Sequence, residues 1–200
     1  QPLRPEKATM ALAPAAPDAR PASDHEPLWQ NPWASVRYVD AVDGQGRTYK
    51  HTAVRSGSGL GALVIPRVVQ RGVASFGFVE IDRPVIGATL VEFPRGGTSD
   101  LSSSEAAREL VEETGITTDR LVRLGSLHPD TGLLDTEVGA WLATQPHQAP
   151  PHIDPETGSR LLWLTHGEVT GAIASGSIRC GMTLAAWAMF AASSHFQTVA

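Results

Sequence analysis

The pattern of apolar and polar residues predicts strands in the first half of the chain. Alternation at 35–42, the turn signal Asp43-Gly44 and a second stretch at 47–54 predict a β-hairpin. Apolar, β-branched runs predict two buried strands, at 62–69 and 73–81, separated by a turn. Further strands are expected after residue 120, at 121–127, 137–144 and 160–164.

Helical signals begin at residue 101. Ser102 and Glu105 form a Ser-x-x-Glu capping box, in which each side chain is expected to accept a free backbone N–H. Gly115 stands where a left-handed residue ends a helix. A second capping box, Thr165-x-x-Glu168, predicts a helix to about residue 175, and an apolar helix is expected at 182–194.

The first of these helices has two faces at about 100° per residue. One side is expected to pack on a core and contains Ala106, Ala107, Leu110, Val111 and Thr114. The other side contains Glu105, Arg108, Glu109, Glu112 and Glu113. Its carboxylates repel one another, and two of them lie in the last turn, where the helix dipole disfavours negative charge. Because Mg²⁺ and Mn²⁺ prefer oxygen ligands, this side is either a solvated acidic surface or a divalent-metal site.

The second half of this helix resembles a known signature. Residues 108–116 read R-E-L-V-E-E-T-G-I and match the second half of the Nudix box, R-E-(apolar)-x-E-E-x-G-(apolar), at all seven specified positions. The first half of that box normally reads G-x5-E-x7-R. Here Asp100 stands in the place of the Glu, and the loop between Gly96 and Asp100 is two residues short. The chain is thus similar to Nudix hydrolases in the helix and departs from them in the loop.

The residues before the helix resemble one Nudix subfamily, the ADP-ribose pyrophosphatase-like hydrolases. There a strand ends in a Q-Y-R-like triplet, and E-(L/F)-P-x-G follows. Residues 81–83 (I-D-R) and 92–96 (E-F-P-R-G) occupy those places. The resemblance implies substrate-binding roles for Arg83, Glu92 and Gly96, with Arg83 at the phosphates or the terminal ribose. It also makes the backbone carbonyl of Arg95 a metal ligand; for Arg83, a plain surface arginine is the alternative.

The resemblance also implies how the acidic residues of the helix act. Glu109, Glu112 and Glu113 would bind Mg²⁺ or Mn²⁺, and Arg108 would pair with these carboxylates and orient them. Such a site would cleave ADP-ribose or a related nucleoside diphosphate sugar into a nucleoside monophosphate and a sugar phosphate. The alternatives are another Nudix substrate (NADH, a dinucleoside polyphosphate or a damaged nucleotide) and a non-catalytic nucleotide-binding regulator, which the short loop and Asp100 keep open.

The general base has more than one candidate. It is either Glu109 on the helix or a catalytic carboxylate on the polar, Pro-rich loop 145–159, where Glu156 is the first candidate and Asp154 the second. Glu137 is expected to be an exposed strand carboxylate, with a metal or water contact as the alternative. The fold implied by the resemblance is α/β, the Nudix α/β/α sandwich with a mixed sheet and an N-terminal β-hairpin extension.

Composition excludes several classes of binding partner and cellular location. The net charge of −5 argues against a general nucleic-acid or anionic-membrane binder, so the expected partner is a nucleoside diphosphate-linked small molecule. The single cysteine, Cys180, excludes an internal disulfide and fits a reducing compartment. No run approaches the roughly 18 apolar residues of a membrane span, and the start of the chain lacks an apolar signal-peptide region, so we expect a cytoplasmic protein.

The N-terminal region has two parts. Residues 1–27 are rich in Ala and Pro without periodicity and predict a flexible tail before one domain at 28–200. Trp29 and Trp33 are expected to pack an N-terminal strand onto this domain. The alternative is that one of them stacks on a base or joins a subunit interface, which makes Trp33 a candidate substrate-binding residue. Members of the resembled subfamily are usually homodimers, so a homodimer is expected here.

Overall fold

A computed structural model describes residues 26–145 and 147–196, so most of the predicted N-terminal tail lies outside the described residues. The strands of the N-terminal half are β1 (Trp29–Gln30), β2 (Ala34–Val42), β3 (Thr48–Ser56), β4 (Leu60–Gln70), β5 (Val73–Arg83), β6 (Ala88–Glu92) and β7 (Arg95–Gly97). The remaining elements are α1 (Ser103–Thr114), β8 (Leu121–Leu127), β9 (Glu137–Gln145), β10 (Arg160–Thr165), α2 (His166–Ala174) and α3 (Gly181–Ala192). The predicted hairpin and the strands predicted after residue 60 are confirmed to within a few residues at their ends.

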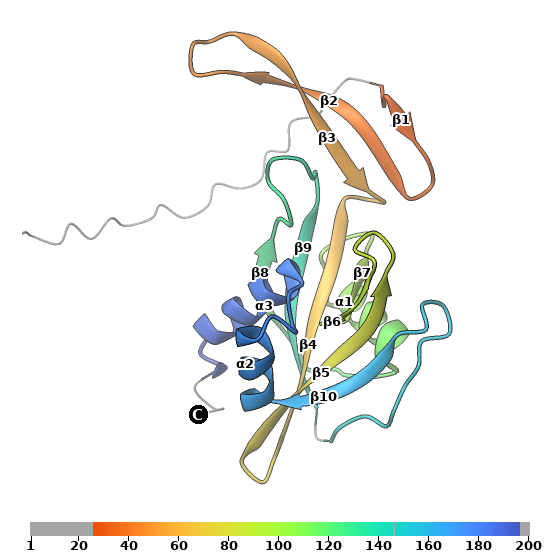
Figure 1. The fold of residues 1–200 in the computed structure, drawn as a ribbon, viewed down its shortest axis with the longest axis vertical. Coiled ribbons are helices and arrows are strands. Elements are labelled where there is room, and N and C mark those ends of the chain that lie inside the picture. The colour runs from red at the N-terminus through yellow and green to blue at the C-terminus, as the bar shows by residue number, and fades with distance from the viewer. Residues whose placement is uncertain (1–25, 146, 197–200) are drawn as a thin grey trace, which may run out of the picture.

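The N-terminal hairpin is part of a small sheet of its own. Strands β1, β2 and β3 form an antiparallel sheet that projects from the rest of the molecule (Figure 1). Asp135, in the loop between β8 and β9, accepts hydrogen bonds from both Arg37 and Arg55. In addition, the Val54 N–H donates to the carbonyl of Leu133 at 2.9 Å. These contacts attach the hairpin extension to the larger sheet.

The main sheet is mixed. Its order is β10-β5-β4-β9-β8, with β4 and β9 parallel and the other pairs antiparallel. Strands β4 and β5 pair with each other only near their shared turn, at residues 67–70 and 73–76. Beyond it they diverge, and the segment 88–97 fills the gap, with β6 paired to β5 and β7 paired to β4. The E-F-P-R-G segment is therefore held inside the sheet rather than in a free loop.

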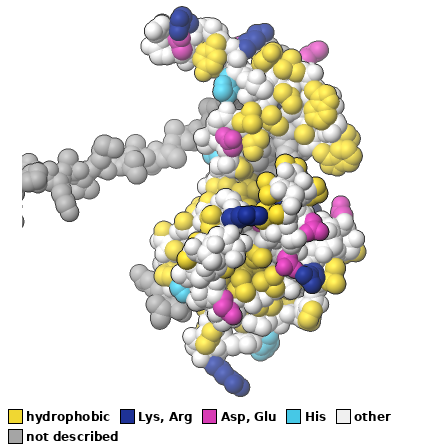
Figure 2. Space-filling view, viewed as in Figure 1, with side chains coloured by type: hydrophobic (Ala, Val, Ile, Leu, Met, Phe, Trp, Pro, Cys, Tyr) yellow, Lys and Arg dark blue, Asp and Glu magenta, His cyan; other side chains and the backbone are white. Residues whose placement is uncertain are grey.

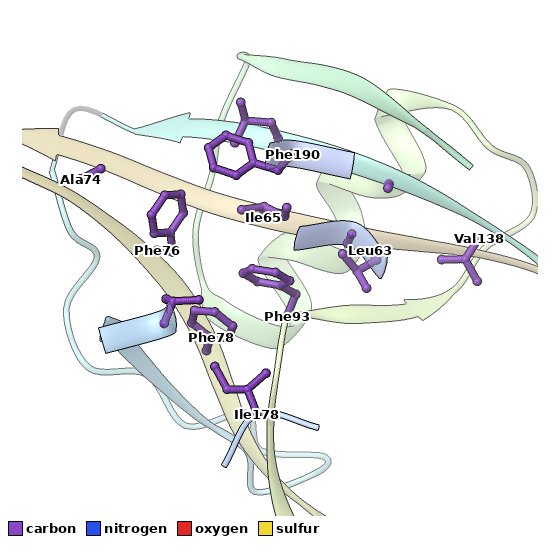
Figure 3. Packing of buried hydrophobic residues seen from close by; sticks show 13 residues of the cluster. Leu63, Ile65, Ala74, Phe76, Phe78, Phe93, Val138, Ile178 and Phe190 are labelled. Atoms are coloured by element: carbon purple, nitrogen blue, oxygen red, sulfur yellow. The ribbon is translucent and has the colours of Figure 1, made fainter. Parts of the chain in front are cut away.

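Alternating side chains of the main sheet build one core on each face. Leu63 and Ile65 of β4 lie in a cluster with Phe76 and Phe78 of β5 and Phe190 of α3 (Figure 3). The alternate β4 residues pack on the other face against α1, in a cluster with Ala62, Val64, Ala106, Leu110, Ile116 and Trp141. Figure 1 shows α2 and α3 on one side of the sheet and α1 on the other. The chain thus has a mixed α/β architecture with helices on both faces.

Local signals fixed the ends of α1, but the structure corrects two details. Ser102 Oγ accepts the Glu105 N–H at 3.3 Å and Gly115 has φ 68°, as predicted. The second half of the capping box is wrong: the Glu105 carboxylate accepts the Ser99 N–H instead. The predicted faces are also partly wrong, because Val111 is 40% exposed whereas Glu109 is only 6% exposed.

The tryptophans of the N-terminal sheet do not pack onto the domain as expected. Trp29 and Trp33 are 54% and 74% exposed. Leu28, Val42 and Tyr49 of the same region are exposed as well. Figure 2 shows apolar side chains gathered over the part of the molecule that this sheet forms. Base stacking and a subunit interface, the two alternatives for Trp33, stay predictions. Separately, no helix in the described part of the chain is long and apolar enough to span a membrane.

Candidate active site

Arg108 holds the carboxylates along the exposed side of α1. Its Nη1 donates to Glu112 at 2.7 Å, its Nη2 to Glu109 at 2.7 Å, and its Nε to Glu105 at 3.2 Å. The same Nη2 donates to the Gly97 carbonyl of β7 at 3.1 Å. The hydrogen bonds that Glu105 accepts from Arg108 and from the Ser99 N–H lower the pKa of Glu105 to about 2. The predicted pairing of Arg108 with the carboxylates is therefore present, and it also ties α1 to β7.

Gly96 makes room for the Glu109 carboxylate. A Cβ placed on Gly96 would lie 1.8 Å from Glu109 Oε2, which is far too close for two non-bonded atoms. Only a glycine in β7 lets the Glu109 side chain reach this buried position. Burial, opposed by the charge of Arg108, raises the pKa of Glu109. The structure thus brings together Gly96 and Glu109, which the sequence analysis had placed in one site from the motif alone.

Glu113 lies further along the helix among several charged groups. Burial, followed by repulsion from Asp154 and Glu109, raises the pKa of Glu113 to about 7. The charges of Arg83 and Arg95 oppose this rise without overcoming it. An acid with this pKa exchanges its proton near neutral pH, where hydrolytic chemistry runs.

Glu92 fixes the two arginines that face Glu113. Its carboxylate is 2% exposed and accepts Arg83 Nε at 3.0 Å, Arg83 Nη2 at 2.7 Å and Arg95 Nε at 3.0 Å. Burial alone would raise the pKa of Glu92, but the hydrogen bonds and charges of Arg83 and Arg95 outweigh it and lower the pKa. Arg83 is therefore not a plain surface arginine.

A pocket of about 500 Å³ opens beside this ion pair, and we call it the arginine pocket. It is lined by Arg83, Ile86, Leu90, Glu92, Arg95, Arg179, Cys180 and Gly181. Thr183 Oγ1 accepts the Phe93 N–H at 3.1 Å, which fixes the first turn of α3 next to Glu92. Sequence reasoning missed Arg179, because a single arginine before a helix belongs to no motif and nothing local indicates which pocket it reaches.

The loop between β9 and β10 places its two candidate carboxylates differently. Asp154 is 7% exposed and is the loop group whose charge acts on Glu113. Burial would raise its pKa, but hydrogen bonds from Thr157 and from the Glu156 N–H outweigh it and lower the pKa. Glu156, the first candidate, is exposed and contributes that N–H, at 2.9 Å from Asp154 Oδ1. The second candidate is thus the one that the fold brings to the helix.

Two further carboxylates, Asp100 and Glu137, lie outside the acidic side of α1. Asp100, which stands in the place of the usual Glu of the box, accepts the Ser102 N–H at 2.8 Å and so supports the start of α1. Glu137, expected to be exposed, is 9% exposed at the start of β9. The expectation for Glu137 is wrong: β9 is an interior strand of the main sheet, between β4 and β8, and Glu137 lies opposite Leu60 of β4.

The carboxylates of α1 are the candidate ligands for a divalent cation. In the part of the chain that the structure describes, no three His, Cys, Asp or Glu side chains are grouped closely enough to hold one ion. Burial and repulsion nevertheless raise the pKa of both Glu109 and Glu113. The repelling carboxylates are Glu112 and Glu105 for Glu109, and Asp154 and Glu109 for Glu113. Hard oxygen donors under such repulsion suit Mg²⁺ or Mn²⁺, since a cation removes the repulsion. The chemistry of these donors therefore fits this kind of ion, whereas their grouping in this structure is not that of a three-ligand site.

Comparison with known proteins assigns no family to the chain. No protein-family model matches the chain, and no curated protein matches it. The roles of the residues are therefore argued from the geometry above and from the residue pattern of α1.

Proposed function

We propose that this protein is a Nudix-type, metal-dependent pyrophosphohydrolase that acts on ADP-ribose or a related nucleoside diphosphate sugar. The products would be a nucleoside monophosphate and a sugar phosphate. One observation carries the proposal: the acidic side of α1 and the arginine pair on Glu92 meet at Glu113, whose charge interacts with both Arg83 and Arg95. Carboxylates beside fixed guanidinium groups suit a substrate that arrives as a diphosphate with a divalent cation.

The carboxylates of α1 and the Arg95 backbone carbonyl would hold the cation. Glu109 supplies buried oxygen donors and Glu113 half-buried ones, and Glu112 supplies exposed donors, 55% accessible and paired with Arg108. Mg²⁺ or Mn²⁺, when bound, would neutralise phosphate charge and lower the pKa of a bound water. Arg108 would keep the carboxylates oriented through its planar set of donors.

The remaining residues would bind the diphosphate and move the proton. Arg83, fixed by Glu92 at two atoms, would present its remaining N–H groups to the phosphate oxygens. A water oxygen would attack one phosphorus while the bridging P–O bond breaks, so that the bridging oxygen leaves with the other phosphate. The proton of that water would pass to a carboxylate, with Asp154 and Glu109 favoured over Glu156 by their burial beside the helix.

The test is a hydrolysis panel with Mg²⁺ and Mn²⁺. It contains ADP-ribose, a UDP- or GDP-sugar, NADH, a diadenosine polyphosphate and 8-oxo-dGTP, each assayed for release of a nucleoside monophosphate or phosphate. Wild type is compared with Glu113→Gln, Asp154→Asn and Glu156→Gln. Asp119→Asn is the matched control, because Asp119 is an exposed carboxylate just after α1. We expect Glu113→Gln and Asp154→Asn to lower kcat by roughly 10²–10⁴-fold.

Other results would change the proposal in defined ways. Preference for another panel compound would keep the hydrolase and replace the substrate. An equal loss in Glu156→Gln and none in Asp154→Asn would return the base to the first loop candidate. Nucleotide binding without turnover of any compound would indicate the non-catalytic regulator, a reading that Asp100 favours because its carboxylate is engaged by the Ser102 N–H.

A further inference from the structure

The arginine pocket carries more positive charge than its own carboxylate balances. Three guanidinium groups line it, those of Arg83, Arg95 and Arg179, whereas Glu92 is the one acidic side chain in its lining. Glu92 is already bound at two atoms by Arg83 and at one by Arg95. An excess of fixed cations in a concave site attracts an anion and raises its local concentration.

Arg179 differs from the other two arginines. Its side chain is exposed, and among residues 26–145 and 147–196 it makes no ion pair and no side-chain hydrogen bond. Arg83 and Arg95, in contrast, are fixed by Glu92 and still have N–H donors that Glu92 does not use. The pocket therefore combines two preoriented cations with a third that is free to move onto a ligand.

The first turn of α3 adds to the same field. Its N-cap residue, Cys180, makes no side-chain capping hydrogen bond to the helix. The backbone N–H groups at the start of a helix carry partial positive charge, so this uncapped turn favours an anion at its end. Because Thr183 is anchored to the Phe93 N–H, the turn stays at the wall of the pocket together with Arg179.

We propose that Arg179 is a substrate-binding residue that contacts the diphosphate in the arginine pocket, together with the free donors of Arg83 and Arg95. This inference rests on the proposed function for the identity of the substrate, but not for the binding of the anion. The pocket borders the acidic side of α1, since the charges of Arg83 and Arg95 act on Glu113. Its volume of about 500 Å³ lies within the range of small-ligand sites.

The first experiment measures anion binding without turnover. Calorimetric titration with inorganic pyrophosphate, at low salt and in EDTA, is carried out on wild type, Arg179→Gln and Arg179→Lys. Arg120→Gln is the matched control, because Arg120 is also an exposed arginine but lies just before β8, outside the pocket lining. Inorganic phosphate is the second probe, and a diphosphate site binds it more weakly than pyrophosphate.

We expect Arg179→Gln to raise the Kd for pyrophosphate about tenfold, the value of one charge-assisted hydrogen bond. Arg179→Lys should recover part of the affinity, because the charge remains while the planar fork is lost. Arg120→Gln should bind like wild type. Equal affinity of wild type and Arg179→Gln, or no binding of pyrophosphate by wild type, would overturn the inference.

The second experiment separates this inference from the proposed hydrolase. With whichever compound of the panel is cleaved, Arg179→Gln should raise KM about tenfold and leave kcat within about twofold, since it removes binding shared by ground and transition states. Turnover with an unchanged KM would refute the role of Arg179 and leave the hydrolase intact. Binding of pyrophosphate that depends on Arg179, with no turnover of any compound, would support the anion site and refute the hydrolase.

Discussion

The acidic side of α1 and the arginine pocket are neighbours with opposite imbalances of charge. On α1, the carboxylates of Glu105, Glu109 and Glu112 share one guanidinium group, that of Arg108, and Glu113 adds a fourth carboxylate that Arg108 does not bind. In the pocket, three guanidinium groups line the wall beside one carboxylate, that of Glu92, which pairs with two of them. The pKa values reflect the difference: that of Glu113 is raised to about 7, whereas that of Glu92 is lowered.

This difference shows which charges the fold satisfies internally and which it leaves for a ligand. Glu92 is completed by its own arginines and serves as a structural anchor. Glu109 is buried and Glu113 is half-buried, each with too little positive charge beside it, and Arg179 is exposed without an acidic partner among the described residues. A divalent cation would neutralise the carboxylates of α1, and the diphosphate bound to it would neutralise the guanidinium groups of the arginine pocket. The comparison of the two regions therefore supports the proposed function.

The largest effect is expected from Glu92→Gln, which removes the carboxylate that pairs with Arg83 and Arg95. The neutral amide leaves Arg83 and Arg95 without the buried carboxylate that holds them. We expect the free energy of unfolding at pH 7 to fall by about 2–4 kcal/mol, measured by urea denaturation. Because the pKa of Glu92 is lowered in the folded state, its stabilising contribution is present above its ordinary pKa and is lost as the pH falls through the lowered value. The difference between wild type and variant should therefore shrink in acid.

Glu80→Gln is the matched control for that variant. Glu80 lies on the same strand, β5, and pairs with Arg160, whose side chain is 64% exposed. Exposed ion pairs stabilise weakly, so a loss below about 0.5 kcal/mol is expected. If both variants lose equal stability, Glu92 is no more than a surface partner.

The second-largest effect is expected from Gly96→Ala, which displaces a carboxylate of α1 without unfolding the protein. In Gly96→Ala the new methyl group would meet the end of a flexible side chain, the Glu109 carboxylate, and not backbone. We expect the carboxylate to move aside, so that the affinity for Mn²⁺ falls about 10–100-fold while the free energy of unfolding changes by less than about 1 kcal/mol. Electron paramagnetic resonance of free Mn²⁺ measures the affinity.

Gly97→Ala serves as the neighbour control for Gly96→Ala. A Cβ on Gly97 has no atom within 4 Å, so this variant should keep the affinity of wild type. Equal Mn²⁺ affinity in Gly96→Ala and Gly97→Ala would show that the Glu109 position plays no part in metal binding.

The smallest effect concerns Glu113 and pH. Between pH 4.5 and about 7 the folded protein keeps a proton on Glu113 that the unfolded chain has released. In EDTA the free energy of unfolding should therefore fall as the pH rises through this window, by about 1–2 kcal/mol, because Glu113 is not fully buried. Denaturation of wild type and Glu113→Gln at several pH values measures this slope. A slope that is the same in both proteins would show that Glu113 titrates normally.

Some features could be predicted because they depend on residues close together in the sequence. The ends of α1 follow from Ser102 and Gly115, which act within one turn of the helix. The strands follow from runs of apolar and β-branched residues, whose two-residue period sets the buried face. The acidic side of α1 likewise follows from helical spacing, since residues three and four apart share a side, whereas its pairing with Arg108 was implied by the resemblance to the Nudix box.

Other features depend on segments far apart in the sequence, and only the tertiary structure decided them. The burial of Glu109 needs Gly96 in a neighbouring strand, and the approach of Asp154 rather than Glu156 to Glu113 depends on how a loop some 40 residues later packs. Arg179 reaches the arginine pocket because the Phe93 N–H anchors Thr183 across the fold. The physical reason is that capping and periodicity act through the local backbone, whereas burial and electrostatic interaction depend on which surfaces the folded chain brings into contact.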